Sequence, residues 1–376
     1  MTRTNVVVPA WPTAKETTKL LDPEVDLKKE ANQSRPAKFA SFVALIALIW
    51  SWVLQAEASQ SLQLFFNKPF FLACFNHAAP VVLLPMIVGY YKVYGSSADQ
   101  YADFVGVLQH HSVIPLPRLV YISGVLSVIY LISDLFWYAA LGQVSVAAGV
   151  AISNSSPLFV YCLSVCFLNE HLNLNKILGV LTAFVGVILI VIFQDGSGFG
   201  TIEATTIVAG ISMIISSAIY AGYQVALQLA IGEDITDTST LLTLAGVCGL
   251  FTFPPWILGT FLLAESPLTW LRESLAFPGT AEGVFLLAIS GALTVVFCAF
   301  LPLAICWTSP LETSVGCMLT IPLSGIMDTC IHHTKFSWEC IIGSVLVMAG
   351  FAILECSTKK PPLSSQEETP NASAWA

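Results

Sequence analysis

Residues 145–192 read SVAAGVAISNSSPLFVYCLSVCFLNEHLNLNKILGVLTAFVGVILIVI, and they hold two apolar runs joined by a short polar link. A helix needs roughly 20 apolar residues to cross a bilayer, and each run is about that long. The first run is rich in small residues and contains Pro157, and the second carries Gly179 and Gly186. These residues therefore predict two successive membrane-spanning helices.

The same order of features returns in residues 309–356, which read SPLETSVGCMLTIPLSGIMDTCIHHTKFSWECIIGSVLVMAGFAILEC. Pro322 lies centrally in a small-residue run, and a polar link leads to a run with Gly343 and Gly350. The first glycine follows the proline by 22 residues in one copy (157 to 179) and by 21 in the other (322 to 343). Small residues let helices pack closely in any polytopic protein, but the shared order favours an internal repeat.

Ten such runs predict an all-α polytopic membrane protein with ten transmembrane helices. Their approximate bounds are 39–58, 69–91, 118–140, 144–167, 174–193, 205–230, 240–264, 283–304, 309–330 and 338–356. The ten spans divide into two five-helix repeats, 38–200 and 201–356, and the second is inverted because five is an odd number. Polar tails, 1–37 and 357–376, flank the repeats and are predicted to be disordered.

Composition agrees with lipid as the main solvent of the chain. Charged residues make up 10% of it and apolar residues 56%, whereas a soluble domain has about 25% charged residues. This balance excludes a soluble enzyme, a nucleic-acid-binding domain and a secreted disulfide scaffold. The ten cysteines lie within or beside apolar runs, where Cys acts as a small hydrophobe.

The distribution of Lys and Arg predicts the orientation. With ten spans, both tails lie on one side, and that side collects twelve of the fifteen Lys and Arg residues. Positively charged loops stay in the cytosol, so both termini are predicted to be cytosolic.

Four segments carry a resemblance to a known family. They are WVLQAEASQSLQLFFNKPFFLACFNHAAPVVLLP at 52–85, DLFWYAAL at 134–141, NEHLNLNKILG at 169–179, and the run from Thr308 to Leu323. Over about residues 40–356 the chain resembles the drug/metabolite transporter superfamily of EamA type. Within it, the chain is most similar to the F branch of the solute carrier 35 family and its fungal relatives.

The resemblance implies ten helices in two five-helix repeats and transport of a small organic metabolite. It also implies an endomembrane or vacuolar location, with the plasma membrane left open. Asp134 stands where the family more usually has Asn, and Gln224 and Gln228 stand where relatives often have Lys. Because no basic residue is expected at mid-span, recognition of nucleotide sugars is not carried over.

Asp134 is the leading candidate for a functional polar group inside the membrane. Tyr130 and Tyr138 share its helical face at positions i−4 and i+4. An acid among aromatic rings can bind a cationic or heteroaromatic solute by charge pairing and stacking, or it can bind and release a proton. The competing interpretation is an interfacial acid within an aromatic belt.

Other polar residues at membrane depth are assigned to the same pathway. They are Glu57 at the end of the first span, Asn154 and Ser156 beside a proline, and Tyr220, Tyr223 and Gln224 late in the sixth. Their structural alternatives are solvated helix ends and groups that satisfy a carbonyl freed by proline; Asp328 is expected to be such a solvated end. The pathway is predicted to be lined by the first, third, fourth, sixth and ninth helices.

Six further residues are assigned to helix packing or hinge motion: Pro157, Gly179, Gly186, Pro322, Gly343 and Gly350. Glycines seven apart lie on one helical face, which favours close helix contact.

The polar stretch 92–117 contains the adjacent His110 and His111, which are expected to be solvated. Neither a metal nor a cofactor is predicted, and no catalytic motif was found, so the chain is read as a non-enzyme. Inverted repeats are typical of secondary transporters. The sequence therefore predicts a carrier that uses alternating access, with proton coupling or exchange, and leaves a homodimer open. The alternative is a non-transporting receptor or scaffold.

Overall fold

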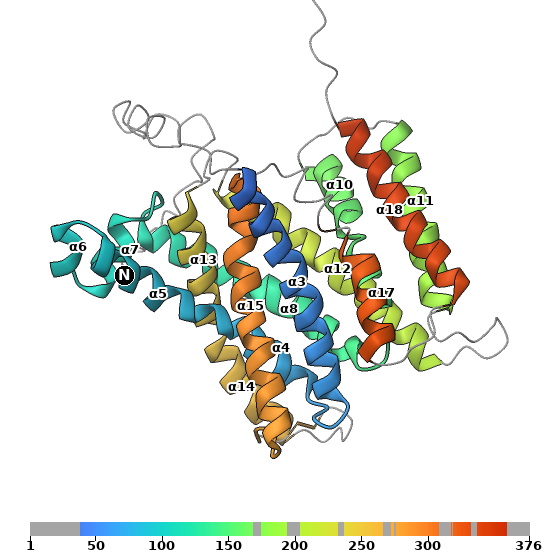
Figure 1. Ribbon diagram of the computed structural model, residues 1–376, viewed down its shortest axis with the longest axis horizontal. Helices are drawn as coiled ribbons and strands as arrows, with labels where there is room; N and C mark the ends of the chain where they lie inside the picture. Colours follow the sequence, from blue (N-terminus) through green and yellow to red (C-terminus); the bar gives the residue numbers. More distant parts are fainter. Residues whose placement is uncertain are drawn as a thin grey trace, which may run out of the picture.

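The structure is a computed structural model of the chain, and it describes residues 38–167, 174–193, 204–231, 237–265, 272–273, 276–307, 317, 319–331 and 337–358. These residues form helices without strands. The helices gather into a bundle, with α11 and α18 together at one side and α6 and α7 at the opposite side (Figure 1). The predicted all-helical class is thus confirmed.

Within the described ranges, six helical segments are long and apolar enough to cross a membrane. They are Phe42–Gln63, Pro69–Tyr94, Leu116–Leu141, Ala204–Leu227, Thr238–Ala264 and Ala281–Leu301. Shorter apolar helices cover Val146–Val160, Ile177–Phe193 and Trp338–Gly350. Six segments establish a multi-pass membrane protein and coincide with the first three and the sixth to eighth predicted spans.

Four helices run without interruption through the middle of the bundle: α3 (Lys38–Gln63), α8 (Leu116–Leu141), α12 (Ala204–Ile231) and α15 (Ala281–Trp307). Many large apolar side chains on the outer surface are exposed, among them Val125, Val128 and Ile188. Exposed apolar area on this scale suits a lipid-facing surface.

Proline interrupts three of the predicted spans. The second consists of α4 (Pro69–Ala78), the 3-10 turn η2 (Ala79–Val82) and α5 (Leu83–Tyr94), with Pro80 in the turn. The seventh consists of α13 (Thr238–Phe251) and α14 (Phe253–Ala264), which meet just before Pro254. The fourth consists of α9 (Val146–Ser153) and α10 (Ser156–Phe167). Proline lacks the backbone N–H and clashes with the preceding turn, so each break has a local cause.

Helices distant in sequence pack together in the bundle. The closest pairs are α3 with α15, α8 with α12, and α11 (Leu174–Phe193) with α18 (Trp338–Thr358) (Figure 1). The helix α17 (Thr320–Ile331) packs on α9 and α3. One buried cluster around Trp137, Ile152 and Met213 joins these helices, and a second around Leu119 and Val247 lies near α5 and α13.

Glycines make the contact between α11 and α18. A Cβ at Gly186 would lie 2.5 Å from the Gly343 carbonyl oxygen, and one at Gly350 would lie 2.5 Å from that of Gly179. The residue numbers rise along one helix as they fall along the other, so the two helices are antiparallel. The absence of side chains at these positions lets the backbones touch.

Candidate functional site

A cavity of about 50 Å³ lies among six elements of the bundle. Its lining comes from α4, η2, α8, α12, α13 and α15 and consists of Asn76, His77, Pro80, Tyr130, Asp134, Tyr223, Ala245, Cys248, Thr294 and Cys298. The third and sixth predicted spans, α8 and α12, are among these elements. The second, seventh and eighth also contribute, which the sequence did not predict.

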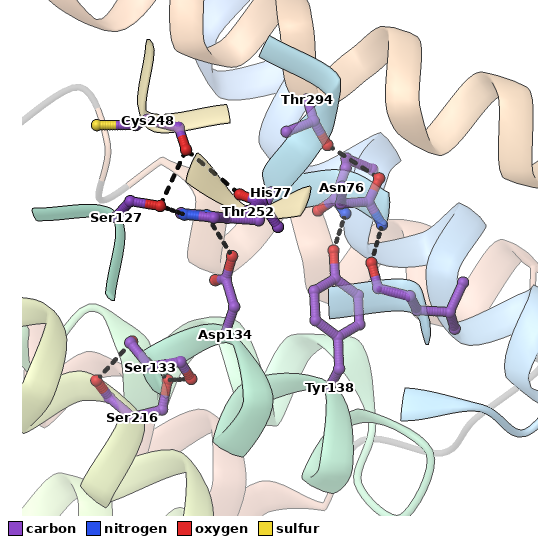
Figure 2. Close-up of polar contacts among 12 residues, drawn as sticks. Asn76, His77, Ser127, Ser133, Asp134, Tyr138, Ser216, Cys248, Thr252 and Thr294 are labelled. Carbon is purple, nitrogen blue, oxygen red and sulfur yellow. Dashed lines mark hydrogen bonds and ion pairs between the residues drawn. The ribbon is translucent and has the colours of Figure 1, made fainter. Parts of the chain in front are cut away.

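His77 and Asp134 form the ionisable centre of this cavity. The Nδ1 atom of His77 lies 3.3 Å from Oδ2 of Asp134, and the two side chains are 3% and 17% exposed. The other ring nitrogen, Nε2, lies 3.3 Å from Oγ of Ser127, whose hydroxyl donates to the Cys248 carbonyl at 2.9 Å. Figure 2 shows His77 between Ser127 and Asp134. Since the Ser127 proton goes to a carbonyl, the Ser127 oxygen is the acceptor for His77 Nε2–H.

Three tyrosine rings lie beside this pair. Tyr130 contacts the His77 ring edge-on, with centroids 4.7 Å apart, and stacks on Tyr223 at 5.0 Å. Tyr220 stacks on Tyr223 in turn at 5.7 Å. The cavity thus has an aromatic wall next to a carboxyl and an imidazole.

Tyr138 joins a separate hydrogen-bond network on the same face of α8. Its hydroxyl accepts from Gln55 Nε2 of α3 at 2.5 Å. Asn76 Oδ1 accepts from Ser290 at 2.9 Å and from Thr294 at 3.2 Å, both on α15. These neutral groups link α3, α4, α8 and α15 around the cavity.

A second group of polar residues lies where α9 meets α17. Asn154 donates from Nδ2 to the Val150 carbonyl at 2.8 Å and to Thr320 Oγ1 at 3.1 Å. Asp328, which is 0% exposed, accepts from the Ala147 N–H at 2.9 Å. The expectation of a solvated helix end at Asp328 is therefore wrong, because its carboxylate caps the first turn of α9.

Glu57 is 2% exposed, so it lies within the protein. It interacts electrostatically with Asp328 across the contact of α3 and α17. Glu57 and Asn154 are not among the residues lining the cavity; Ser156 is buried, and Gln224 is half-buried beside Tyr223. Of the nine predicted pathway residues, Tyr130, Asp134 and Tyr223 line the cavity and Tyr220 extends its aromatic wall. The other five lie outside the lining, with Tyr138 and Asn154 in hydrogen-bond networks.

Two functional candidates were missed at the sequence level. His77 and Asn76 lie inside the second predicted span and are 4% and 2% exposed. The expectation that no basic residue lies at mid-span overlooked His77. A histidine and an asparagine within an apolar run of this length would have been the signal, because polar groups are costly in a membrane.

Glu273 closes one end of the bundle by capping α4. Its carboxylate oxygens accept from the backbone N–H groups of Phe70 at 2.8 Å and Phe71 at 3.0 Å. Burial raises the pKa of Glu273, against the lowering effect of these two hydrogen bonds and of Lys68. The N–H groups in the first helical turn have no partner within the helix, so a distant carboxylate supplies the cap that holds α4 in place.

Replacing Glu273 by Ala should lower the free energy of unfolding by about 1–2 kcal/mol, the usual loss for a helix cap. Thermal unfolding in detergent at alkaline pH, where the carboxyl is ionised, measures the change. The stability of Glu273→Gln should lie between those of the parent and of Glu273→Ala, because the amide keeps one acceptor oxygen. Arg272→Ala at the exposed neighbouring position is the control. Equal stabilities for Glu273→Ala and this control would contradict the capping role.

The chain is similar to several proteins that are named as transporters. A family model described as the EamA-like transporter family matches residues 100–192. An uncharacterized transporter of Schizosaccharomyces pombe is 27% identical over 238 residues, covering 62% of this chain and 67% of that protein. Solute carrier family 35 member F5 of Macaca fascicularis is 28% identical over 233 residues, covering 60% of this chain and 51% of that protein.

Two further matches complete the comparison. An uncharacterized vacuolar membrane protein of Saccharomyces cerevisiae is 23% identical over 249 residues, covering 64% of this chain and 62% of that protein. A crystal structure described only as that of a protein aligns with a TM-score of 0.52 and 16% identity, over 87% of this chain and 99% of the other, and so bears on the fold alone. The matches confirm the predicted relationship to the drug/metabolite transporters and to the F branch of solute carrier 35. The aligned regions span between about half and two thirds of the sequence relatives' own length.

Proposed function

We propose that the chain is a secondary transporter of a small organic metabolite, and that it works by alternating access. In this proposal ten spans form two inverted repeats, residues 38–200 and 201–356, and the solute binds in the cavity that holds His77 and Asp134. The observation that carries the proposal is the ionisable pair with its aromatic wall, placed between helices of both repeats. The names of the relatives support the same class of function.

The packing of the helices supports the repeat. If each span of the first half corresponds to the span five positions later, then the pair α3 with α15 corresponds to α12 with α8. Both pairs are among the most extensive contacts of the bundle. The pairs α9 with α17 and α11 with α18 correspond to themselves, and both are also in contact. A pseudo-twofold axis relating the halves accounts for this pattern.

The glycines fit the same axis. By their distance from the prolines, Gly179 corresponds to Gly343 and Gly186 to Gly350. The observed contact of Gly186 with Gly343 is then exchanged with the contact of Gly350 with Gly179. Tight packing at these four positions holds the ends of the two repeats together. The backbone breaks beside Pro157, Pro80 and Pro254, together with Pro322, are the proposed hinges.

The lining of the cavity favours a cationic or heteroaromatic solute. Asp134 can pair with a positive charge, and Tyr130 and Tyr223 offer ring faces for stacking or cation–π contact. Among the described residues that line it there is neither Lys nor Arg, so in this part of the lining only the His77 imidazole could offer a positive charge to an anion. In the proposal, the aromatic wall is positioned around the solute by Tyr220, Gln224 and Tyr138. The packing of the neighbouring helices is set by Glu57, Asn154 and Ser156.

Proton coupling follows from the hydrogen bonds of His77. A neutral imidazole has one N–H, and here Nε2–H is used toward Ser127. The contact between Nδ1 and Asp134 then needs a second proton between nitrogen and oxygen. His77 and Asp134 therefore share this second proton. It lies either on Nδ1, which gives imidazolium with carboxylate, or on Asp134, which gives imidazole with carboxylic acid. Releasing it changes the charge beside the solute.

In the proposed arrangement both termini face the cytosol and the membrane is an endomembrane, with a vacuolar relative in support. Neither a cofactor nor a catalytic step is needed, because the solute crosses unchanged. An engineered cysteine near each terminus should react with a membrane-impermeant reagent only from the cytosolic side.

The test of the function is transport by the purified full-length chain in liposomes. The panel contains thiamine-like cations, nucleobases, amino acids and nucleotide sugars, each measured with and without a pH gradient. We expect gradient-driven accumulation of a cationic or heteroaromatic solute. Counterflow that does not depend on the pH gradient would indicate exchange and contradict proton coupling. Failure of the whole panel with folded protein would favour the alternative, a receptor or scaffold.

A further inference from the structure

Asp99, His110 and His111 form a cluster away from the cavity. They lie in the segment between α5 and α8, where α6 (Ser97–Tyr101) and α7 (Phe104–His110) project to the left in Figure 1. The ligand atoms of the three residues lie within 4.8 Å of one another. The sequence alone suggested two solvated histidines. Asp99 lies eleven positions before His110, and only the fold brings the two together.

Both imidazoles point at the same carboxylate oxygen. His111 Nε2 lies 2.9 Å and His110 Nδ1 lies 3.1 Å from Asp99 Oδ1. Ligands at about 2.0–2.2 Å from a tetrahedral Zn²⁺ are roughly 3.3 Å apart. The two nitrogen–oxygen separations are within a few tenths of an ångström of that ligand spacing, and all three ligand atoms lie within 4.8 Å of one another, so an outward shift of the groups would admit an ion.

Neighbouring groups fix the orientation of two of the three side chains. The other carboxylate oxygen of Asp99, Oδ2, accepts from the Ser96 N–H at 2.9 Å and from Ser96 Oγ at 3.0 Å. The His111 ring lies flat against Tyr91, with centroids 3.5 Å apart, and the Tyr91 hydroxyl contacts Ser239 at 2.6 Å. Outer-shell contacts of this kind orient the ligands of metal sites.

Exposure leaves a way in for an ion. The Asp99 side chain is 3% exposed, His111 is 22% exposed and His110 is 63% exposed. The carboxylate thus forms the floor, and the open side at His110 admits water as a fourth ligand. Two imidazole nitrogens and one carboxylate oxygen suit zinc and the neighbouring divalent transition metals, and they suit Mg²⁺ or Ca²⁺ poorly.

We propose that Asp99, His110 and His111 bind a divalent transition metal of the zinc class, with water completing the coordination. Binding needs both nitrogens that face Asp99 to be unprotonated, so each ring carries its remaining N–H on the opposite nitrogen. The ion would also hold the α6–α7 segment near the start of α13. Tyr91, which stacks on His111, is hydrogen-bonded to Ser239 there, and Val113, two residues after His111, is hydrogen-bonded to Thr240.

The test is metal binding by the full-length protein in detergent, purified through a tag without histidine and stripped of metal. Zn²⁺ is titrated by calorimetry, and Co²⁺ is added to the same protein to record its absorption spectrum. We expect one Zn²⁺ per chain and the intense visible bands of four-coordinate Co²⁺. Asp99→Asn and His110→Ala should each weaken binding by about tenfold or more.

The chain offers a matched control in its other adjacent pair, His332 and His333, which lies outside the described residues. Replacing both by Ala should leave the affinity within about twofold of the parent. Asp99→Asn retains a group that can bond Ser96, and His110 is largely exposed, so unchanged metal-free thermal unfolding identifies folded variants. The proposal fails if Zn²⁺ binding does not saturate at one site, or if the control variant loses as much affinity as His110→Ala. It also fails if Co²⁺ shows only weak octahedral bands. The cluster would then be a carboxylate hydrogen-bonded to two histidines and not a metal site.

Discussion

Replacing Asp134 by Asn is expected to abolish accumulation driven by a pH gradient and to slow uptake of the solute by at least about tenfold. The amide keeps the shape of the side chain and can still bond His77 Nδ1, which lies 3.3 Å from the carboxylate. It cannot release a proton, and it offers no negative charge to a cationic solute. One lost charge interaction of about 1.4 kcal/mol corresponds to tenfold. Uptake into liposomes at several pH values measures both effects.

His77 supplies the companion experiment. If His77 and Asp134 share one proton, His77→Gln alone should also flatten the pH profile, and the double variant should be no slower than the worse single variant. Glu282→Gln, at an exposed acid in the first turn of α15, should transport as the parent does. Additive losses in the double variant, or an unchanged pH profile in Asp134→Asn, would contradict a shared proton while leaving transport itself in place.

Hydropathy and spacing were sufficient for the helical class and for one side of the cavity. Apolar runs of about 20 residues mark the long helices directly, since lipid excludes unpaired backbone groups. Asp134 stood out as a carboxyl within such a run, and Tyr130 followed from the helical period. These inferences concern single helices, for which local sequence is enough.

Features that depend on how helices meet were not accessible in the same way. Asp328 lies near the end of a predicted span, and nothing local reveals that it caps α9 by accepting from Ala147 N–H. The pairing of Asp134 with His77 requires α4 and α8 to be neighbours. The contacts of Asp99 were likewise hidden, because its partners His110 and His111 follow it by eleven and twelve positions and meet it only through the fold. Long-range contacts of this kind follow from packing, which one sequence specifies only as a whole.

Replacing Gly350 by Ala is expected to reduce the free energy of unfolding by about 3 kcal/mol, at the upper end of overpacking costs. The added Cβ would lie 2.5 Å from the Gly179 carbonyl oxygen and 2.6 Å from the Ala183 nitrogen. Both are backbone atoms, so relief requires α11 and α18 to move apart along their whole contact. Gly186→Ala should act similarly, because its Cβ would lie 2.5 Å from the Gly343 oxygen. Thermal unfolding in detergent and the yield of monodisperse protein measure the loss.

Gly222→Ala in α12 makes the comparison decisive, because a Cβ there has nothing within 4 Å. Alanine is favoured over glycine inside a helix by about 1 kcal/mol, so this control should be neutral or stabilising. The intrinsic preference is the same at Gly350 and Gly186, and only the contact with the facing backbone opposes it. The sign of the change therefore separates packing from propensity. If all three alanine variants shift stability in the same direction, the close approach of α11 and α18 does not hold these helices together.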